Sequence, residues 1–313
     1  MAIFNVGPLP GQERFGAVIT DLPPASIDEP ETRKALHDLW IDKGVIVFRD
    51  IAGGMDTQIR LSEIFGAPEI HPMMVGTSIK TEHKALAPIE YDRESGNLYE
   101  VKGRQLGGYL PWHFDAAYVD RINHGGILRP QILPRSGGET GFLDQIAAYE
   151  LLPRRLRERI EGLSVLYAYQ PDLTKPKFGD RADRIIQMSE LFRKGMDHPS
   201  VQVRAIHPLI YRQAVTGRKV LHVSPWFAEA IEGMENAEGD ALLREVIGYV
   251  LRPELMYFHR WEAGDMVLWD NWRMLHSACG VPPEEKRIMR RTTIVGDYGL
   301  GRREVKPERS PAR

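Results

Sequence analysis

The chain has 313 residues, of which 42% are hydrophobic, and a formal net charge of −2. This length can bury a sizeable core, and the near-neutral charge argues against a general nucleic-acid-binding surface. No window reaches the roughly 18 to 20 apolar residues of a membrane span, and the N-terminus lacks the pattern of a signal peptide. One cysteine, Cys279, beside ten histidines is typical of a protein from the reducing cytoplasm.

Residues 1–66 show the patterns of short strands and two helices. The first helix has Ser26 or Asp28 as a possible cap, acidic residues in its first turn and Gly44 as its stop. Gly66 lies just beyond the second helix. The expected elements are strands at 16–20 and 45–48 and helices at 26–43 and 55–64.

Two stretches interrupt the regular patterns. Residues 67–108 mix proline, glycine and charge, which predicts a long loop, and such a loop beside a candidate site is more often a functional lid than a linker. Residues 175–199 combine a charged loop with a short helix and are the expected insertion. Residues 302–313 are rich in Arg, Lys and Pro, which predicts a loose basic tail.

Many short strands and a few charged helices make up the remainder. The expected strands lie at 125–133, 201–206, 219–223, 254–259, 266–269 and 287–295, and the helices at 146–159, capped by Asp144, and 240–251. Short strands separated by turns, with a few covering helices, predict an α+β, mainly β fold with a sandwich or barrel core rather than βαβ units. We expect one domain over residues 1–301.

The segment Trp112-His113-Phe114-Asp115 places an imidazole and a carboxylate two residues apart. In an extended chain both point to one side, while Trp112 and Phe114 point to the other. An exposed strand edge or an N-capping aspartate would also explain the pair. Two aromatic neighbours that need packing favour a cavity, where the polar pair requires a partner such as a metal.

A third ligand would complete the facial triad of two histidines and one carboxylate that holds Fe(II) in non-haem oxygenases and leaves three positions open. His276, in an apolar run that follows Trp269-Asp270-Asn271, is one candidate. Periodicity alone does not distinguish it from four histidines in or near other apparent strands, His124, His207, His222 and His259.

The last strand carries two arginines on one face. Alternation over 287–295 places Arg287, Met289 and Arg291 together. Guanidinium groups flanked by apolar residues favour carboxylate partners in bidentate geometry, although a charged edge strand would show the same pattern. Together with a metal triad, the pair favours an anionic co-substrate.

With these motifs the sequence resembles the TauD/TfdA family of Fe(II)- and 2-oxoglutarate-dependent dioxygenases, collinearly from about Gly16 to Tyr298. Besides the segments above, the matching motifs are Gly44–Asp50, Phe65-Gly66, Ser136-Gly137-Gly138-Glu139-Thr140, Ala147-Ala148-Tyr149, His207-Pro208 and Arg287-Ile288-Met289. The resemblance implies a double-stranded β-helix (jelly roll) core with covering helices.

The resemblance also assigns the site. His113, Asp115 and His276 would bind Fe(II), and Arg287 and Thr140 would bind the distal carboxylate of 2-oxoglutarate. Arg291 would lie near the 1-carboxylate of 2-oxoglutarate and an anionic group of the substrate. O2 would be the third reactant, and zinc, which cannot perform a redox step, would not replace the iron.

The candidate substrate residues differ from those of taurine dioxygenases. His71 matches a position that contacts the sulfonate there, but Met74 replaces an expected tyrosine and Tyr109 an expected asparagine. Trp272 stands where the family usually has an arginine. Met73, Met74, Tyr109 and Tyr118 predict a more apolar pocket and a substrate larger than taurine, with an anionic group near Arg291 or His71.

The predicted function is hydroxylation of a small organic acid with an apolar or aromatic body, coupled to decarboxylation of 2-oxoglutarate to succinate and CO2. Desaturation or other oxidative tailoring of a biosynthetic intermediate is an alternative at the same iron centre. A jelly-roll protein that binds these ligands without turnover and a zinc hydrolase are alternatives from other classes. By analogy with the family, we expect a homo-oligomer.

Overall fold

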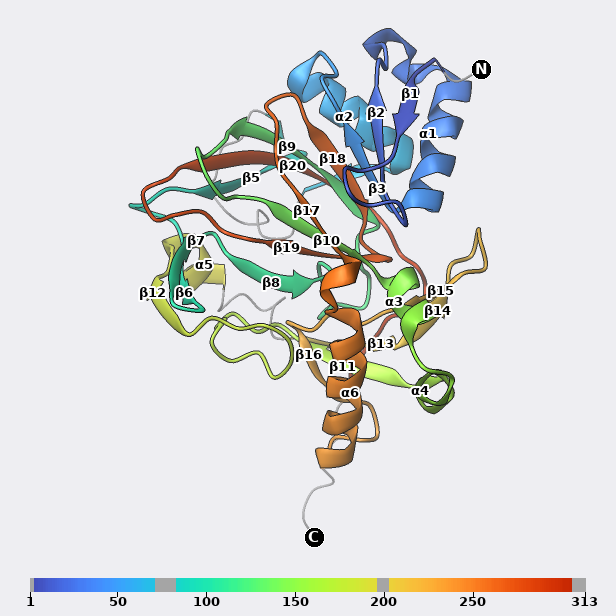
Figure 1. Ribbon diagram of the computed structural model, residues 1–313, viewed down its shortest axis with the longest axis vertical. Helices are drawn as coiled ribbons and strands as arrows, with labels where there is room; N and C mark the ends of the chain where they lie inside the picture. The colour runs from blue at the N-terminus through green and yellow to red at the C-terminus, as the bar shows by residue number, and fades with distance from the viewer. Residues whose placement is uncertain (1–2, 71–82, 196–202, 306–313) are drawn as a thin grey trace.

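Two sheets face each other across the upper half of the molecule (Figure 1). The computed structural model describes residues 3–70, 83–195 and 203–305. The larger sheet has the order β1-β2-β3-β18-β9-β20-β4, with β5 also paired to β20, and only its β2–β3 pair is parallel. Its strands are β1 (Asn5–Gly7), β2 (Ala17–Thr20), β3 (Val45–Phe48), β4 (Pro68–Glu69), β5 (Leu86–Tyr91), β9 (Gly125–Ile132), β18 (Met266–Asp270) and β20 (Arg287–Ile294).

The smaller sheet has the order β17-β10-β19-β8. Its strands are β8 (Leu110–His113), β10 (Thr140–Asp144), β17 (Met256–His259) and β19 (Met274–Ala278). Apolar side chains from both sheets form one buried cluster between them, among them Val47, Phe142, Val267, Met274 and Met289. This is the expected jelly-roll arrangement, and the two arginines of β20 lie on the face that is turned toward the smaller sheet.

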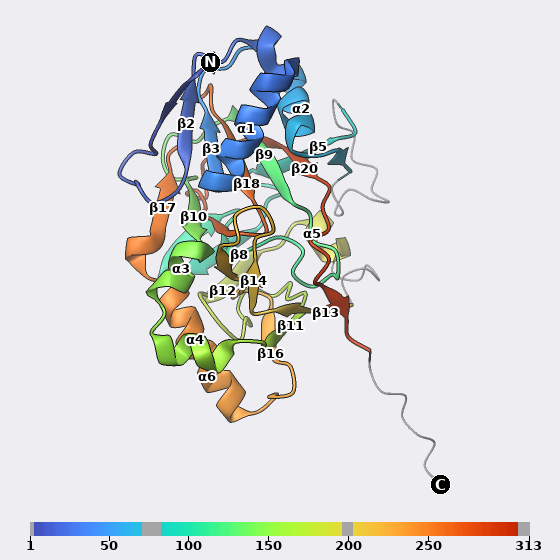
Figure 2. The ribbon, with the colours of Figure 1, turned by 90° about the vertical axis from the view of Figure 1, so that its right-hand side faces the viewer.

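Two helices, α1 (Pro30–Lys43) and α2 (Gly54–Phe65), cover the outer face of the larger sheet (Figure 2). The first begins later than expected: residues 24–28 form a short 3-10 helix, and the Ser26 hydroxyl donates to the carbonyl of Pro23 instead of capping α1. Gly44 ends α1 as expected. Its φ of 75° is left-handed, and its N–H donates to the carbonyl of Trp40.

A lower layer supports the smaller sheet with the sheet β16-β11-β13-β21, the hairpin β14-β15 and three helices (Figure 1). Its elements are β11 (Ser164–Ala168), β13 (Arg204–Pro208), β14 (Ile210–Arg212), β15 (Lys219–Leu221), β16 (Ala228–Ile231), β21 (Arg302–Arg303), α3 (Gln145–Leu151), α4 (Arg154–Ile160) and α6 (Ala237–Val250). Asp144 caps α3 as predicted, by accepting from the N–H of Ile146. The single helix expected at 146–159 is wrong, because Pro153 divides it into α3 and α4.

Among its described residues, the loop expected at 67–108 contains four short strands. Besides β4 and β5, it contains the hairpin β6 (Leu98–Val101) and β7 (Arg104–Gly107). The insertion expected at 175–199 contributes β12 (Arg184–Gln187), which pairs with β6, and the predicted short helix, α5 (Glu190–Gly195). The expected loose tail is also ordered where it begins, since β21 pairs with β13. Residues 306–313 lie outside the described residues.

Among the residues that the structure describes, no helix has both the length and the apolar character needed to cross a bilayer. The two longest, α1 and α6, have 14 residues each.

Candidate active site

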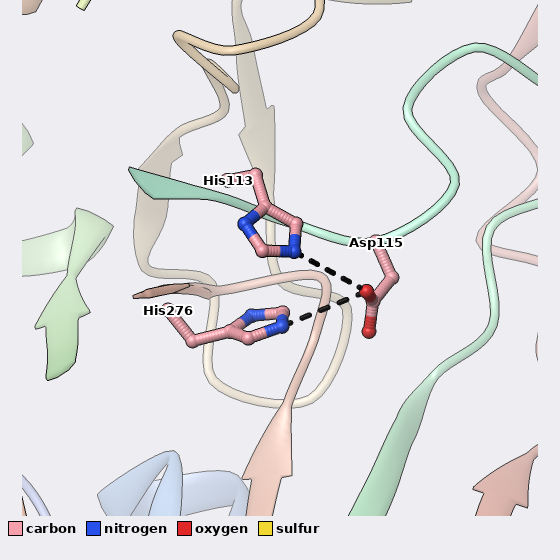
Figure 3. A group of neighbouring side chains, drawn as sticks. All are labelled: His113, Asp115 and His276. Carbon is pink, nitrogen blue, oxygen red and sulfur yellow. Dashed lines mark ion pairs between the residues drawn. The ribbon is translucent and has the colours of Figure 1, made fainter. Parts of the chain in front are cut away.

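His113, Asp115 and His276 converge at one edge of the smaller sheet (Figure 3). His113 ends β8 and lies directly opposite His276 of β19 in the strand register, while Asp115 follows two residues beyond β8. Oδ1 of Asp115 is 3.5 Å from Nε2 of His113 and 3.6 Å from Nε2 of His276. One potential ligand atom from each residue lies within 4.8 Å of the other two, which is a suitable spacing for a metal ion held on one face.

The protonation states suit a metal ion. Nδ1 of His113 lies 2.7 Å from the carbonyl oxygen of Pro111, which can only accept, so Nδ1 carries the proton and Nε2 keeps its lone pair for the centre. Burial lowers the pKa of His276 to about 4, which keeps this imidazole neutral. Burial favours the protonated form of Asp115, but the Arg291 guanidinium opposes it, and the pKa of this carboxyl is held well below its usual range.

The backbone of Asp115 is held by Asn271, which has no exposed surface. The N–H of Asp115 donates to Oδ1 of Asn271 at 2.8 Å, and Nδ2 of Asn271 donates to the carbonyls of Asp115 and Asn123. The next residue, Ala116, has a φ of 58°, so the chain turns sharply here. The amide of Asn271 thus holds the turn that carries Asp115, which is a physical reason for the Trp-Asp-Asn motif to accompany the triad. Sequence reasoning did not identify this role of Asn271.

The aromatic residues that flank His113 are buried, as predicted. Phe114 stacks on His222 with 4.2 Å between ring centroids, and its N–H donates to Oγ of Ser224 at 3.2 Å. Trp112 packs in the same core cluster. The predicted separation of the polar pair from its aromatic neighbours therefore holds, although β8 itself ends at His113.

The other candidate histidines have different environments. His207 lies between the Val119 carbonyl and the Tyr298 hydroxyl, and His259 is bonded to Asp265. The remaining two stack on aromatic rings, His124 on Trp272 and His222 on Phe114. Within the described ranges, only His276 joins His113 and Asp115.

The inward face of β20 carries both arginines, with Arg287 8% and Arg291 7% exposed. Nη2 of Arg291 donates to Oδ2 of Asp115 at 2.6 Å, and its guanidinium lies 4.9 Å from the ring centroid of Trp269. Its Nε makes no hydrogen bond within the described part of the chain. Arg291 is therefore already paired with a candidate metal ligand, which sequence reasoning did not predict.

Arg287 has no such carboxylate partner among the residues that the structure describes. Its Nη2 lies 3.5 Å from Oγ1 of Thr140, and among the described residues its Nε has no partner. Burial lowers the pKa of Arg287 to about 10 because nearby charge does not offset the lost hydration. Gly138, at a φ of 79°, lets the backbone approach this side chain, since a Cβ there would lie 3.2 Å from Cδ of Arg287. A buried guanidinium beside a hydroxyl, with donors to spare, fits a carboxylate ligand.

Four aromatic rings near the triad form a surface that we call the aromatic wall: Tyr118, Tyr169, Trp226 and Phe227. Trp226 and Phe227 contact the ring of His113 edge-on, with centroid distances of 5.0 and 5.8 Å. Tyr118 joins the wall through Phe227 at 5.2 Å. Of these residues, sequence reasoning identified only Tyr118, because the others lie far along the chain and carry no motif of their own.

The other predicted substrate residues are placed differently. Tyr109 is half-buried beside Gly280 and Cys279, and His71, Met73 and Met74 lie outside the described residues. Trp272 stacks on His124, while its neighbour Arg273 makes two buried 2.8 Å bonds to Asp144. The arginine near the Trp-Asp-Asn motif is thus shifted by one residue and holds the cap of α3.

Several known proteins are similar to this chain in sequence or in fold. The family model "Taurine catabolism dioxygenase TauD, TfdA family" matches residues 5–293. A (S)-phenoxypropionate/alpha-ketoglutarate-dioxygenase of Sphingobium herbicidovorans is 30% identical over 294 residues, which cover 94% of this chain and 96% of the relative. An alpha-ketoglutarate-dependent 2,4-dichlorophenoxyacetate dioxygenase of Cupriavidus pinatubonensis is 29% identical, covering 87% and 94%.

Among solved structures, a taurine dioxygenase from Burkholderia xenovorans superimposes with a TM-score of 0.72 at 22% identity and covers 97% of both chains. This likeness supports the jelly-roll fold. The family match over most of the chain, the related enzymes and the clustered His-Asp-His residues agree. The chain belongs to the TauD/TfdA family of dioxygenases that depend on non-haem Fe(II), 2-oxoglutarate and O2.

Proposed function

We propose that this enzyme hydroxylates a small organic anion with an apolar or aromatic body, coupled to the conversion of 2-oxoglutarate into succinate and CO2. The observation that carries the proposal is the meeting of a three-ligand centre, His113, Asp115 and His276, with buried arginines on the facing strand. The bound metal and co-substrate supply the oxidising chemistry, while the protein positions the reactants and excludes water.

Each polar side chain has a role in this proposal. The two imidazole Nε2 atoms and Oδ1 of Asp115 would hold Fe(II) on one face. Arg287 and Thr140 would bind the distal carboxylate of 2-oxoglutarate, because this guanidinium is buried without a carboxylate in the described chain. Arg291 would face the 1-carboxylate or the anionic group of the substrate through its Nε, which has no hydrogen-bond partner in the described chain.

The aromatic wall is evidence for a substrate that carries an aryl ring or an extended apolar group. Two of its rings, Trp226 and Phe227, lie directly beside His113, and offset or edge-on contacts with an aryl ring are favourable there. The relatives' names refer to phenoxypropionate and 2,4-dichlorophenoxyacetate, which combine an aromatic ring with a carboxylate. We infer that aryloxy and arylalkyl acids are the first compounds to test, and that taurine is a poor substrate.

The first experiment is an anaerobic titration of the Fe(II)-loaded protein with 2-oxoglutarate, followed by the weak visible charge-transfer band of the chelate. The band should appear with the wild type and be lost in Arg287→Ala at the same concentration. Arg290→Ala, on the opposite face of β20, is the matched control and should retain it. Absence of the band in iron-loaded wild type would contradict the assigned site.

Substrate screening with aryl, alkyl, sulfonate and amino acids then tests the second half of the proposal. Succinate release that is highest with an aryl acid supports it, and release that is highest with taurine contradicts it. Product mass separates hydroxylation, which adds an oxygen atom, from desaturation, which removes two hydrogens.

Two further features belong to the proposal. The single cysteine, Cys279, is consistent with a cytoplasmic enzyme that has no disulfide framework. A homo-oligomer is expected by analogy with the family, and light scattering of the purified protein measures it directly.

A further inference from the structure

We propose that Trp261 is a positioning residue for the co-substrate: its indole N–H orients the Thr140 hydroxyl so that the hydroxyl proton faces the distal carboxylate of 2-oxoglutarate. This inference rests on the proposed function, because it assumes that Thr140 and Arg287 bind that carboxylate. Trp261 would act on the co-substrate only through Thr140 and Arg287.

The hydrogen bonds around Thr140 carry the inference. Nε1 of Trp261 donates to Oγ1 of Thr140 at 3.0 Å, and Nη2 of Arg287 approaches the same oxygen at 3.5 Å. Indole and guanidinium groups can only donate. A hydroxyl has two lone pairs and one proton, so these neighbours occupy its accepting side. The hydroxyl proton is left for a third group, and a carboxylate would accept it.

Trp261 is held firmly enough to act in this way. It follows β17, whose His259 lies opposite Thr140 in the strand register and contacts the Trp261 ring edge-on at 4.7 Å. His259 is fixed by Asp265 through a 3.0 Å bond from Nε2, and Asp265 also accepts from Nε of Arg49 at 3.1 Å. The side chain of Asp265 is fully buried, so this polar chain ties the turn after β17 to the larger sheet.

The indole of Trp261 also lies near the guanidinium of Arg287. The guanidinium carbon of Arg287 is 6.0 Å from the ring centroid of Trp261, at the outer limit of a cation–π contact. Trp261 could therefore act through the hydroxyl of Thr140 or through the charge of Arg287. The short N–H bond of 3.0 Å, against a cation–π distance at its outer limit, favours Thr140.

A double-mutant cycle separates these routes. Binding of 2-oxoglutarate to the Mn(II)-loaded protein is measured by calorimetry for wild type, Trp261→Phe, Thr140→Val and the double variant. Phenylalanine keeps an aromatic ring and removes the N–H, and valine keeps the shape of threonine and removes the hydroxyl. Loss of one hydrogen bond predicts about 3- to 10-fold weaker binding in Trp261→Phe.

The cycle has a defined outcome. If Trp261 acts through Thr140, Trp261→Phe causes less than about a twofold further loss in the Thr140→Val background. Thr140→Ser, which keeps the hydroxyl, should bind close to wild type and remain sensitive to Trp261→Phe. Mn(II) affinity should be the same in all of these variants, since none changes a candidate metal ligand.

Other results would overturn the inference. Wild-type affinity in Trp261→Phe would show that the N–H is not used, and an equal loss in both backgrounds would show that the ring acts on Arg287 or on packing. Trp261→Leu is a second replacement should the phenylalanine variant fold poorly. If Mn(II)-loaded wild type does not bind 2-oxoglutarate, the proposed function itself fails, which is a distinct result.

Discussion

Arg291 occupies one oxygen of Asp115 and leaves the other facing two imidazoles. The bond from Nη2 to Oδ2 is 2.6 Å long, whereas Oδ1 lies 3.5 Å from His113 and 3.6 Å from His276. The carboxylate is thereby presented through a single oxygen, which leaves more of a metal's coordination positions free than a two-oxygen mode would. Because Arg291 is buried and Asp115 is largely shielded from solvent, removing the cation leaves a carboxylate charge without its partner.

The first prediction concerns this pair. Arg291→Met preserves length but removes the partner of Oδ2, so the carboxylate is free to rotate and Mn(II) affinity should fall roughly 10- to 100-fold. Calorimetry with Mn(II) measures the change. Arg290→Met is the matched control on the same strand, because Arg290 points away and pairs with Glu90. Equal affinities in Arg291→Met and wild type would show that the pair does not organise the site.

The second prediction concerns the clamp on the Asp115 backbone. Asn271→Ala removes one acceptor and two donors from a fully buried position, and should lower the free energy of unfolding by about 2 to 4 kcal/mol. Metal affinity should fall as well, because the turn that carries Asp115 loosens. Urea titration and Mn(II) calorimetry measure the two effects.

Asn5→Ala is the control for that experiment. Its Nδ2 bonds to Asp21 at the exposed surface, and its loss should change stability by less than about 0.5 kcal/mol. A similarly small loss in Asn271→Ala would mean that the Asp115 turn is held by other contacts.

The third prediction is a pH dependence of stability. Burial lowers the pKa of His207 to about 4 in the folded chain, against 6.5 as its ordinary value. Between these values the unfolded state binds more protons, so stability is lost as the pH falls from about 6.5 toward 4. For this residue alone the loss between pH 7.5 and pH 5 is about 2 kcal/mol.

His207→Asn should remove that share of the acid sensitivity. Urea unfolding of wild type and variant at the two pH values gives the difference directly. The variant loses the bonds to Val119 and Tyr298, so it should be less stable at pH 7.5 and show a smaller further loss at pH 5. Parallel pH profiles would contradict the assignment of a neutral buried imidazole.

The fourth prediction tests the aromatic wall. Tyr118→Leu removes a ring that contacts Phe227 and Tyr169, and should raise the KM for an aryloxy acid roughly 3- to 10-fold. Binding of 2-oxoglutarate should be much less affected. Tyr249→Leu, whose ring contacts Arg252 near the end of α6, is the control. An unchanged KM in Tyr118→Leu would place the substrate body elsewhere.

Much of the local structure is readable in the sequence. Gly44 ends α1 because glycine adopts the left-handed conformation at little cost, and Asp144 caps α3 because a carboxylate accepts from the first turn of a helix. The alternation in β20 puts Arg287 and Arg291 on one buried face, since side chains in a strand alternate. These are relations between residues close in the chain.

The missed strands show the limit of such patterns. The hairpin of β6 and β7 has only four residues in each strand, and its edge partner β12 comes more than 80 residues later. Strands this short have no long apolar run that would predict them from the sequence. The break between α3 and α4 is a different case, because Pro153 is a local signal for it. The charge pattern over 146–159 favours one continuous helix instead.

The candidate site divides in the same way. His113 and Asp115 are separated by one residue, and the family motifs around them are also local. The sequence by itself determined these features. Residue patterns leave His276 among five candidate histidines, and the resemblance to the family selects it. The tertiary structure supplies the physical reason, because the pairing of β8 with β19 places His276, rather than His124, His207, His222 or His259, beside the pair. The Arg291–Asp115 bond, the bond from Trp261 to Thr140 and the aromatic wall likewise join residues far apart in sequence, and only strand pairing and core packing bring them together.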